Sequence, residues 1–184
     1  TEAYTATGNM IFINEQTGYT SGGEFVIYKT SNAGVNWTKF SLYGRNAFGG
    51  IYVLPNQKGF AVGENGTIVK TTNGTNWNFI YNGYEADPLE VAQFINSSTG
   101  WISGDGLIYK TTNSGTNWYK YSLNIVPFGA TRNIGFINEN TGWLAGVEGG
   151  GNFFIKTTNG GQTFSRESYL GTSVSFVNSL TGWM

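Results

Sequence analysis

The side chains that could carry chemistry in this chain are few, and they limit the reactions it can support. Histidine and cysteine are absent, which removes the usual general base, the commonest metal ligand and any thiolate nucleophile. Glycoside hydrolysis by paired carboxylates needs two acids that flank one bond, and the only aspartates are Asp87 and Asp105. Asp105 lies in a tight turn whose counterparts hold Glu24, Glu64 and Glu148. A repeated acid indicates turn chemistry or a ring of surface charge, so we expect no catalytic residue. We also expect no metal site, since histidine is absent, and no cofactor.

A repeated turn must position these residues, because one signature occurs four times along the chain. It reads Lys-Thr-(Ser/Thr)-Asn-x-Gly-x-(Asn/Thr)-aromatic, with one residue fewer in the second copy, and it ends at Trp37, Trp77, Trp118 and Phe164. A second marker, Thr-Gly-aromatic, recurs at Gly18, Gly100, Gly142 and Gly182, with Lys58-Gly59-Phe60 in the remaining slot. A period of about forty residues is typical of propellers, solenoids and repeat arrays.

Each period contains four short runs that read as strands. The runs are rich in β-branched and aromatic residues and are bounded by Gly, Asn, Ser or Asp. Four antiparallel strands in about forty residues make the blade of a β-propeller, whereas a stacked β-solenoid normally uses a shorter rung. We therefore predict an all-β chain that forms a single β-propeller region, residues 1–184, of four-stranded antiparallel blades.

The predicted blades do not close a ring. Complete blades cover about residues 9–42, 50–81, 90–123 and 132–169, and a partial fifth blade covers residues 173–184. An open propeller leaves unpaired strands and uncovered aromatic surface. We therefore expect the chain to be an excerpt of a larger propeller, or a protomer completed by a partner, with self-association through open blade edges as one route.

Two further repeated positions are predicted to serve packing. The lysine before each turn signature is expected to lay its aliphatic stem on neighbouring aromatic rings. These lysines are Lys29, Lys70, Lys110 and Lys156. The aromatic residue after each marker glycine is expected to pack between blades rather than to form a platform for sugars. These aromatic residues are Tyr19, Phe60, Trp101, Trp143 and Trp183.

The Asn-x-Gly-x-(Asn/Thr)-aromatic turn resembles the Asp-box, also called the BNR repeat, of sialidase-type propellers and related proteins. The longer unit, Phe136 to Gly146 followed by Ile155 to Phe164, most resembles the Ycf48 family of photosystem II assembly factors and their bacterial relatives. The resemblance implies a propeller, commonly seven-bladed, that binds another protein without catalysis. It also implies an extracytoplasmic location (periplasmic, secreted or at the cell surface), because such propellers are often carried on secreted or surface proteins.

The aspartate of the Asp-box is asparagine in all four copies, which removes a charge but keeps the turn. An Asx side-chain oxygen can accept bonds from backbone N–H groups, glycine accepts a positive φ, and the aromatic ring fills the blade core. Asparagine is a weak ligand for a hard cation, so we expect these residues to be structural and not metal ligands. They are Asn32, Gly34, Trp37, Asn73, Gly74, Trp77, Asn113, Gly115, Trp118, Asn159, Gly161 and Phe164.

A glycan-binding or sialidase-like glycan-processing propeller is the alternative that the Asp-box resemblance leaves open. Enzymes of that kind use an arginine triad, a tyrosine nucleophile and supporting carboxylates. Arg45 and Arg132 precede innermost strands, whereas Arg166 is expected on an outer strand facing solvent. Tyr84 beside two acids could imitate a nucleophile and base, although a solvated loop is the simpler interpretation. A second alternative is a structural subunit of an extracellular assembly.

Connections between the blades are the expected place for partner binding, because variable loops on a rigid frame usually carry function. They mix arginine, aromatic residues and acids, a composition enriched in recognition surfaces. The predicted partner-binding residues are Arg45, Phe48, Tyr84, Asp87, Phe128 and Arg132. A net charge of −1 gives no electrostatic footprint for nucleic acid, and no apolar stretch approaches the length of a membrane span. We therefore expect a protein partner, or a glycan, but neither nucleic acid nor membrane insertion.

Overall fold

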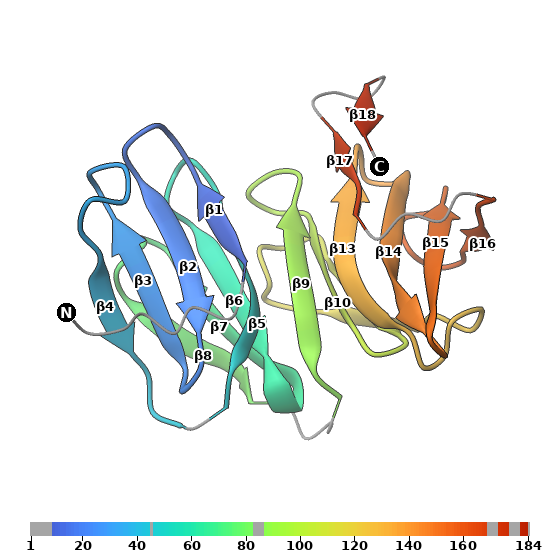
Figure 1. The fold of residues 1–184 in the computed structure, drawn as a ribbon, viewed down its shortest axis with the longest axis horizontal. Helices are drawn as coiled ribbons and strands as arrows, with labels where there is room; N and C mark the ends of the chain where they lie inside the picture. Colours follow the sequence, from blue (N-terminus) through green and yellow to red (C-terminus); the bar gives the residue numbers. More distant parts are fainter. Residues whose placement is uncertain (1–8, 45, 83–86, 169–172, 177–180, 184) are drawn as a thin grey trace. The chain divides into compact units, whose positions relative to one another are not determined.

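The computed structural model describes residues 9–44, 46–82, 87–168, 173–176 and 181–183 (Figure 1). Apart from one 3-10 turn at Glu64–Gly66, the regular secondary structure of these residues is β-strand, which confirms the predicted all-β class. The described residues contain no helix of the length and apolarity needed to cross a membrane. Two compact units make up the chain, Thr1–Leu89 and Glu90–Met184.

The first unit contains two four-stranded sheets, in which each strand pairs antiparallel with the next along the chain. The strands of the first sheet are β1 (Met10–Phe12), β2 (Gly18–Gly22), β3 (Val26–Thr30) and β4 (Thr38–Ser41). The strands of the second sheet are β5 (Phe48–Val53), β6 (Gly59–Gly63), β7 (Thr67–Thr71) and β8 (Trp77–Asn82). Each sheet is one blade.

The second unit contains two more blades and the start of another, each with its strands paired in chain order. One blade consists of β9 (Leu89–Phe94), β10 (Gly100–Gly104), β11 (Leu107–Thr111) and β12 (Tyr119–Ser122). The next consists of β13 (Ala130–Phe136), β14 (Gly142–Glu148), β15 (Gly151–Thr157) and β16 (Ser165–Arg166). The start of the last consists of β17 (Ser175–Phe176) and β18 (Gly182–Trp183). Four complete blades and the beginning of a fifth are therefore present, as predicted.

The marker glycine makes room for a phenylalanine ring on the neighbouring strand in every blade except the second, where Gly59 lies against Val53. Phe12 pairs with Gly18 and Phe136 pairs with Gly142 in the register of the first two strands of their blades. A Cβ atom would lie 2.8 Å from the Phe12 ring at Gly18 and 2.5 Å from the Phe136 ring at Gly142. Such distances are shorter than van der Waals contact, so a side chain at the marker position would displace the ring.

The core of each unit lies between its neighbouring blades. Trp101 is fully buried in the second unit, and its ring lies parallel to that of Phe136 in the next blade, with centroids 3.7 Å apart. Its Nε1 atom donates a hydrogen bond to the carbonyl oxygen of Gly160, 2.9 Å away in the turn signature of that blade. Trp143 packs on Phe176 with a centroid distance of 4.8 Å. The predicted inter-blade packing of these two tryptophans is confirmed.

Trp183 occupies the same repeated position but does not pack in this way. Its side chain is 60% exposed. The part of the chain that the structure describes contains no strand after β18 against which the ring could lie. Packing at this position therefore needs a following blade, and the motif alone does not provide it.

The repeated lysines lie over aromatic rings, as predicted. The Nζ atom of Lys110 lies 5.3 Å from the centroid of the Trp101 ring and donates a hydrogen bond to the Glu139 carbonyl, 2.9 Å away in the next blade. Lys29 lies 5.4 Å from the Tyr19 ring centroid. Lys70 and Lys156 lie over Phe60 and Trp143 at 5.6 and 5.2 Å. These cations therefore cover the aromatic rings of the repeated position, three of which (Tyr19, Phe60 and Trp101) are buried.

Candidate binding face

Side-chain and backbone hydrogen bonds close the turn signature in each of the four complete blades. Asn113 Oδ1 accepts a hydrogen bond from the backbone N–H of Asn117 at 2.9 Å, and Gly115 has a φ of +73°. The Gly115 N–H donates to Thr111 Oγ1, also at 2.9 Å. Asn32 and Asn159 make the equivalent backbone bond at 2.9 and 3.0 Å. The neutral asparagine therefore holds the turn by accepting backbone bonds, which is the structural role predicted for it.

The second copy of the turn signature is one residue shorter than the others, and its asparagine accepts backbone bonds from residues two and three positions later. Asn73 Oδ1 accepts bonds from the N–H groups of Thr75 and Asn76 at 3.0 and 2.9 Å. A Cβ atom at Gly74 would collide with the Tyr19 hydroxyl of the preceding blade. The glycine is therefore required by the packing between blades as well as by its φ of +69°.

The structure separates the six predicted partner-binding residues. Arg45 and Tyr84 lie outside the described residues. The prediction is wrong for Phe48, which is 1% exposed and packs in the core with its ring centroid 5.0 Å from that of Phe25. Phe48 is the first residue of β5, and the bulge at Gly49 shifts the alternation of side chains by one residue, which places Phe48 on the core face with Ile51 and Val53.

The three other predicted residues are exposed. Asp87 lies before β9, and its carbonyl oxygen accepts a bond from Gly66 at 3.1 Å. Phe128 is 87% exposed in the connection between β12 and β13. Arg132 lies within β13. Phe128 and Arg132 are thus four positions apart at the start of one innermost strand.

Arg132 protrudes because β13 contains a bulge. Thr131 pairs with Gly146 and Asn133 pairs with Ala145, which leaves Arg132 without a partner in the ladder. A bulge of this kind re-aims the side chain of the extra residue. The first strand of an earlier blade, β5, has the same irregularity, with Gly49 as its extra residue.

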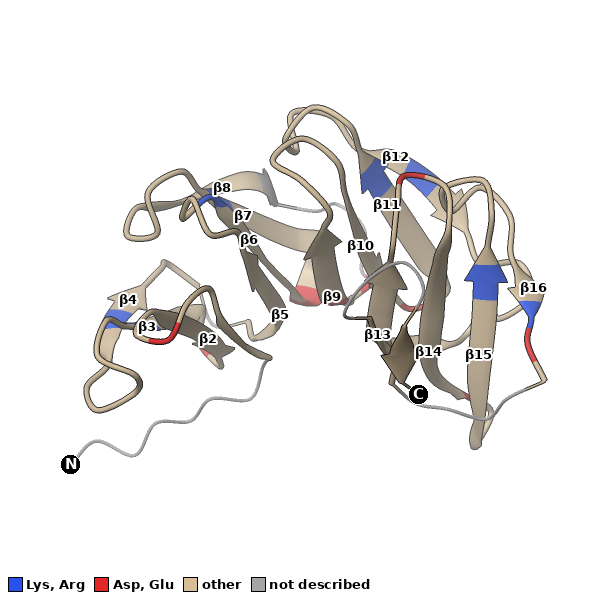
Figure 2. Ribbon diagram, turned by 90° about the horizontal axis from the view of Figure 1, so that it is seen from above, with Lys and Arg blue, Asp and Glu red and all other residues tan. Residues whose placement is uncertain are grey.

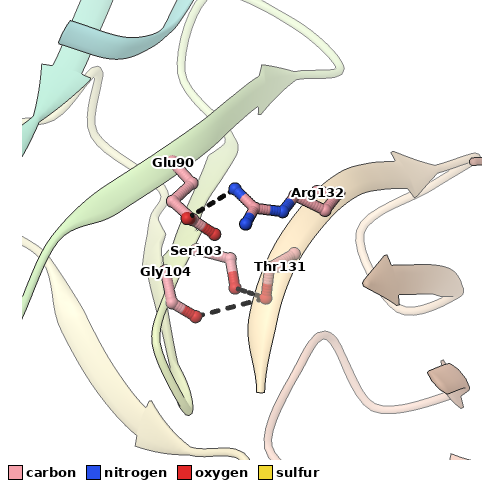
Figure 3. A network of polar contacts seen from close by, with 5 residues as sticks. All are labelled: Glu90, Ser103, Gly104, Thr131 and Arg132. Carbon is pink, nitrogen blue, oxygen red and sulfur yellow. Dashed lines mark hydrogen bonds and ion pairs between the residues drawn. The ribbon is translucent and has the colours of Figure 1, made fainter. Parts of the chain in front are cut away.

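Glu90 faces Arg132 from the preceding blade (Figure 3). It lies four residues before Phe94, as Arg132 lies four residues before Phe136, so the two residues occupy equivalent positions of the repeat. The Nη1 atom of Arg132 donates to Glu90 Oε1 at 2.9 Å, and the two side chains are 56% and 18% exposed, respectively. The other carboxylate oxygen, Oε2, is buried without a hydrogen-bond partner among the described residues.

The electrostatics of this pair are set by the partial burial of Glu90. Burial raises the pKa of the Glu90 carboxyl above its ordinary value, the guanidinium of Arg132 opposes this rise, and the carboxylate of Asp105 adds to it. The attraction of Arg132 therefore offsets only part of the free energy that the Glu90 carboxylate loses when it is removed from water. Charged residues are few along the ribbon (Figure 2), and Arg166 and Glu148 form a second ion pair in the same unit.

Two buried hydroxyl groups support the Arg132 backbone. The Ser103 hydroxyl donates to the Leu107 carbonyl at 2.7 Å, and the Thr131 hydroxyl donates to the Gly104 carbonyl at 3.2 Å. The two hydroxyl oxygens lie 2.9 Å apart (Figure 3). Because these contacts join β10 to β13, the exposed arginine rises from a rigid junction between two blades.

Sequence reasoning missed Glu90, although a signal was present. Opposite charges occupy the same repeat position in consecutive blades, and aligning the repeats from their marker phenylalanines would have placed them side by side. The ion pair between Arg166 and Glu148, 2.7 Å apart, was harder to predict from the sequence. Arg166 lies in β16, and a strand of two residues is too short to show an alternating pattern that would place its side chain.

Glu90→Gln is expected to change how stability depends on pH. The pKa of Glu90 is higher in the folded protein than in the unfolded chain, where it is near 4.5. The protonated carboxyl therefore contributes its full stabilisation below the unfolded-state pKa, and this contribution is lost as pH rises through the folded-state pKa. The melting temperature of Glu90→Gln minus that of the wild type should therefore increase as pH rises from about 4 to 7, because the wild type loses this stabilisation and the variant does not. Thermal melts across this range, with the exposed Glu15→Gln as control, test this. A constant difference across the range would contradict it.

Comparison with known proteins identifies the family. The family model for photosynthesis system II assembly factor YCF48 matches residues 2–174. The chain belongs to the YCF48 family. The match confirms the resemblance expected from the turn signatures and the marker glycines. No curated protein matches the chain.

Solved structures show the same fold in the YCF48 family and in enzymes. A structure of YCF48 bound to D1 peptide matches with a TM-score of 0.72 and 22% identity, over 94% of this chain and 57% of that one. YCF48 from Cyanidioschyzon merolae matches with a TM-score of 0.66 and 16% identity, over 96% of this chain and 66% of that one. The GH74 enzyme of Niastella koreensis matches with a TM-score of 0.63 and 16% identity, over 88% of this chain and 32% of that one. The chain thus spans about three fifths of its YCF48 relatives, and likeness at these identities shows the propeller fold alone.

Proposed function

We propose that this chain is a non-catalytic β-propeller module that binds a polypeptide partner and serves in assembly. The observation that carries the proposal is the presence of an exposed aromatic residue, Phe128, just before β13 and of an exposed arginine, Arg132, near the start of that strand. Neither residue type recurs at its position in the other blades. The YCF48 structure with bound D1 peptide supports a polypeptide as the class of ligand.

The chemistry of the two residues fits a protein interface. Arginine and aromatic residues are enriched among the positions that contribute most to protein binding. Among the described residues, the Arg132 guanidinium is bonded to Glu90 through one nitrogen, so further N–H donors remain for a partner's carbonyl or carboxylate oxygens. Phe128 supplies apolar area that water now covers.

The carboxyl groups also support a role without catalysis. Glu90 is paired with Arg132 and Glu148 is paired with Arg166, so each already has a structural partner. The Glu64 carboxylate accepts a bond from the Ala47 N–H at 3.1 Å, which is the turn chemistry expected of a repeated acid. Likeness to GH74 enzymes concerns the fold and favours no reaction.

We also propose that the protein is exported. The support is its composition, with 11% charged residues and 28 glycines, which resembles that of secreted and surface β-proteins. Fractionation of the source cells with an antibody to the chain would test this location. Recovery of the protein with the cytoplasmic fraction would contradict it.

Photo-crosslinking in the source cells tests the binding face. The full chain would carry p-benzoylphenylalanine at Phe128 or, as control, at Tyr119, an exposed aromatic on the outer strand β12. We expect one discrete protein adduct from position 128 and none from position 119. Arg132→Gln should lower the yield of the adduct on the order of tenfold. The same adducts from both positions would contradict the proposal.

A further inference from the structure

The connection that carries Phe128 is an ordered loop rather than a loose link. It comprises residues 123–129 and is called here the recognition loop. Leu123 and Val126 are buried in the core of the second unit, and Ile125 packs against that core. Phe128 points away from these anchors into solvent. The loop thus buries its apolar residues on one side and exposes its largest one on the other.

Backbone hydrogen bonds fasten both ends of the recognition loop to the turn between β10 and β11. The Leu123 N–H donates to the Gly106 carbonyl at 2.7 Å, and the Gly106 N–H donates to the Gly129 carbonyl at 3.1 Å. Within the loop, Val126 donates to Leu123 at 2.8 Å and Gly129 donates to Val126 at 3.0 Å. A Cβ atom at Gly129 would lie 2.7 Å from the Phe153 ring, so this end of the loop is also closely packed.

Arg166 fastens the middle of the recognition loop from the next blade. Its Nη2 atom donates to the Ile125 carbonyl at 2.8 Å and to Glu148 Oε2 at 2.7 Å. Glu148 ends β14 and Arg166 ends β16, so the ion pair joins these two strands, and the bond to the Ile125 carbonyl ties the outer strand to the loop. An arginine expected to be merely solvent-facing therefore holds the segment that presents Phe128.

From these contacts we infer that the recognition loop is preorganised to insert Phe128 into an apolar socket of the partner polypeptide, with Arg166 as its positioning residue. The inference rests on the proposed function. A loop that is already ordered loses little conformational freedom on binding, so the exposed side chain contributes more to affinity. The loop contains no charged residue. This favours an apolar protein socket over an anionic lipid surface, which attracts basic segments.

The first measurement needs no ligand. Hydrogen exchange at the amides of Val126 and Gly129 reports the order of the recognition loop in the full chain. Arg166→Gln shortens the side chain and removes its charge, so we expect both amides to exchange on the order of tenfold faster. The control Lys120→Gln changes an exposed charge on β12 and should leave them unchanged. Unchanged exchange in Arg166→Gln would overturn the positioning role.

The second measurement uses displayed random dodecapeptides selected on the full wild-type chain and then synthesised with a fluorescent label. We expect Phe128→Ala to weaken their binding on the order of thirtyfold, and Tyr119→Ala to leave it unchanged. Arg166→Gln should weaken binding about fivefold in the wild type and not at all in Phe128→Ala, because Arg166 acts through the position of Phe128. Equal losses in both backgrounds would overturn the positioning role.

Other outcomes separate this inference from the proposed function. If Arg132→Gln abolishes peptide binding and Phe128→Ala does not, the binding face stands and the recognition loop falls. If neither change matters, both fall. Binding to phosphatidylcholine–phosphatidylglycerol vesicles that disappears in Phe128→Ala would assign the loop to a membrane and overturn the inference.

Discussion

Trp101→Ala is expected to lower the free energy of unfolding by about 3–5 kcal/mol, the range for removing a large aromatic side chain from a core. The Trp101 ring is fully buried and lies against Phe136 at 3.7 Å between centroids. Its loss leaves a cavity between two blades. It also leaves the carbonyl oxygen of Gly160 without its donor. Urea unfolding of the full chain followed by circular dichroism would measure the change.

Two variants show where this effect comes from. Trp183→Ala removes the same residue type from the same repeat position, but the side chain is 60% exposed, so we expect a change within about 0.5 kcal/mol. Trp101→Phe keeps an aromatic ring and loses the hydrogen bond to Gly160, so its cost should be smaller than that of Trp101→Ala. Equal losses from Trp101→Ala and Trp183→Ala would contradict the view that packing between blades sets the contribution.

Gly106→Ala is expected to cost about 3 kcal/mol and to displace the recognition loop. Gly106 has a φ of +63°, and a Cβ atom there would collide with the carbonyl oxygen of Pro127. Backbone atoms cannot move aside as a flexible side chain can, so residues 123–129 must shift. We expect faster hydrogen exchange at Gly129 as well as lower resistance to urea.

Gly149→Ala is the matched control for this change. Gly149 has a φ of +58° but no atom within 4 Å of an added Cβ, so the substitution isolates the cost of the left-handed backbone. We expect that cost to be about 1 kcal/mol. The excess in Gly106→Ala then measures the collision with Pro127. Similar costs in the two variants would show that the loop yields freely, which would count against its preorganisation.

Repetition made most of the fold predictable. The strands, their order within each blade, and the role of asparagine in the turn all follow from rules that act between near neighbours in the chain. Trp101 and Trp143 could be assigned to inter-blade packing because a residue repeated from blade to blade meets a similar environment wherever another blade follows. Phe48 was misplaced because its sequence neighbours are glycines and a loop, a context that does not reveal which way the first residue of a strand points.

The candidate site was less predictable, because it depends on contacts between blades. Glu90 and Arg132 are 42 positions apart, and Arg166 and Ile125 are 41 apart. No periodic pattern in the sequence marks the bulge in β13, and this bulge turns the Arg132 side chain toward Glu90. The exposed fraction of Phe128 could be anticipated from its loop, but the bonds that hold that loop could not.

By itself, then, the sequence determined the blade, its four strands, its asparagine turns and the family to which the chain belongs. The blade, its strands and its turns recur along the chain, and each is encoded by residues that lie close together in the sequence. The tertiary structure decided which unrepeated residues act together, placing Glu90 beside Arg132 and Arg166 beneath the loop of Phe128. The physical reason is that side chains from different blades meet only when the blades pack, and packing places residues about one repeat apart within hydrogen-bond distance.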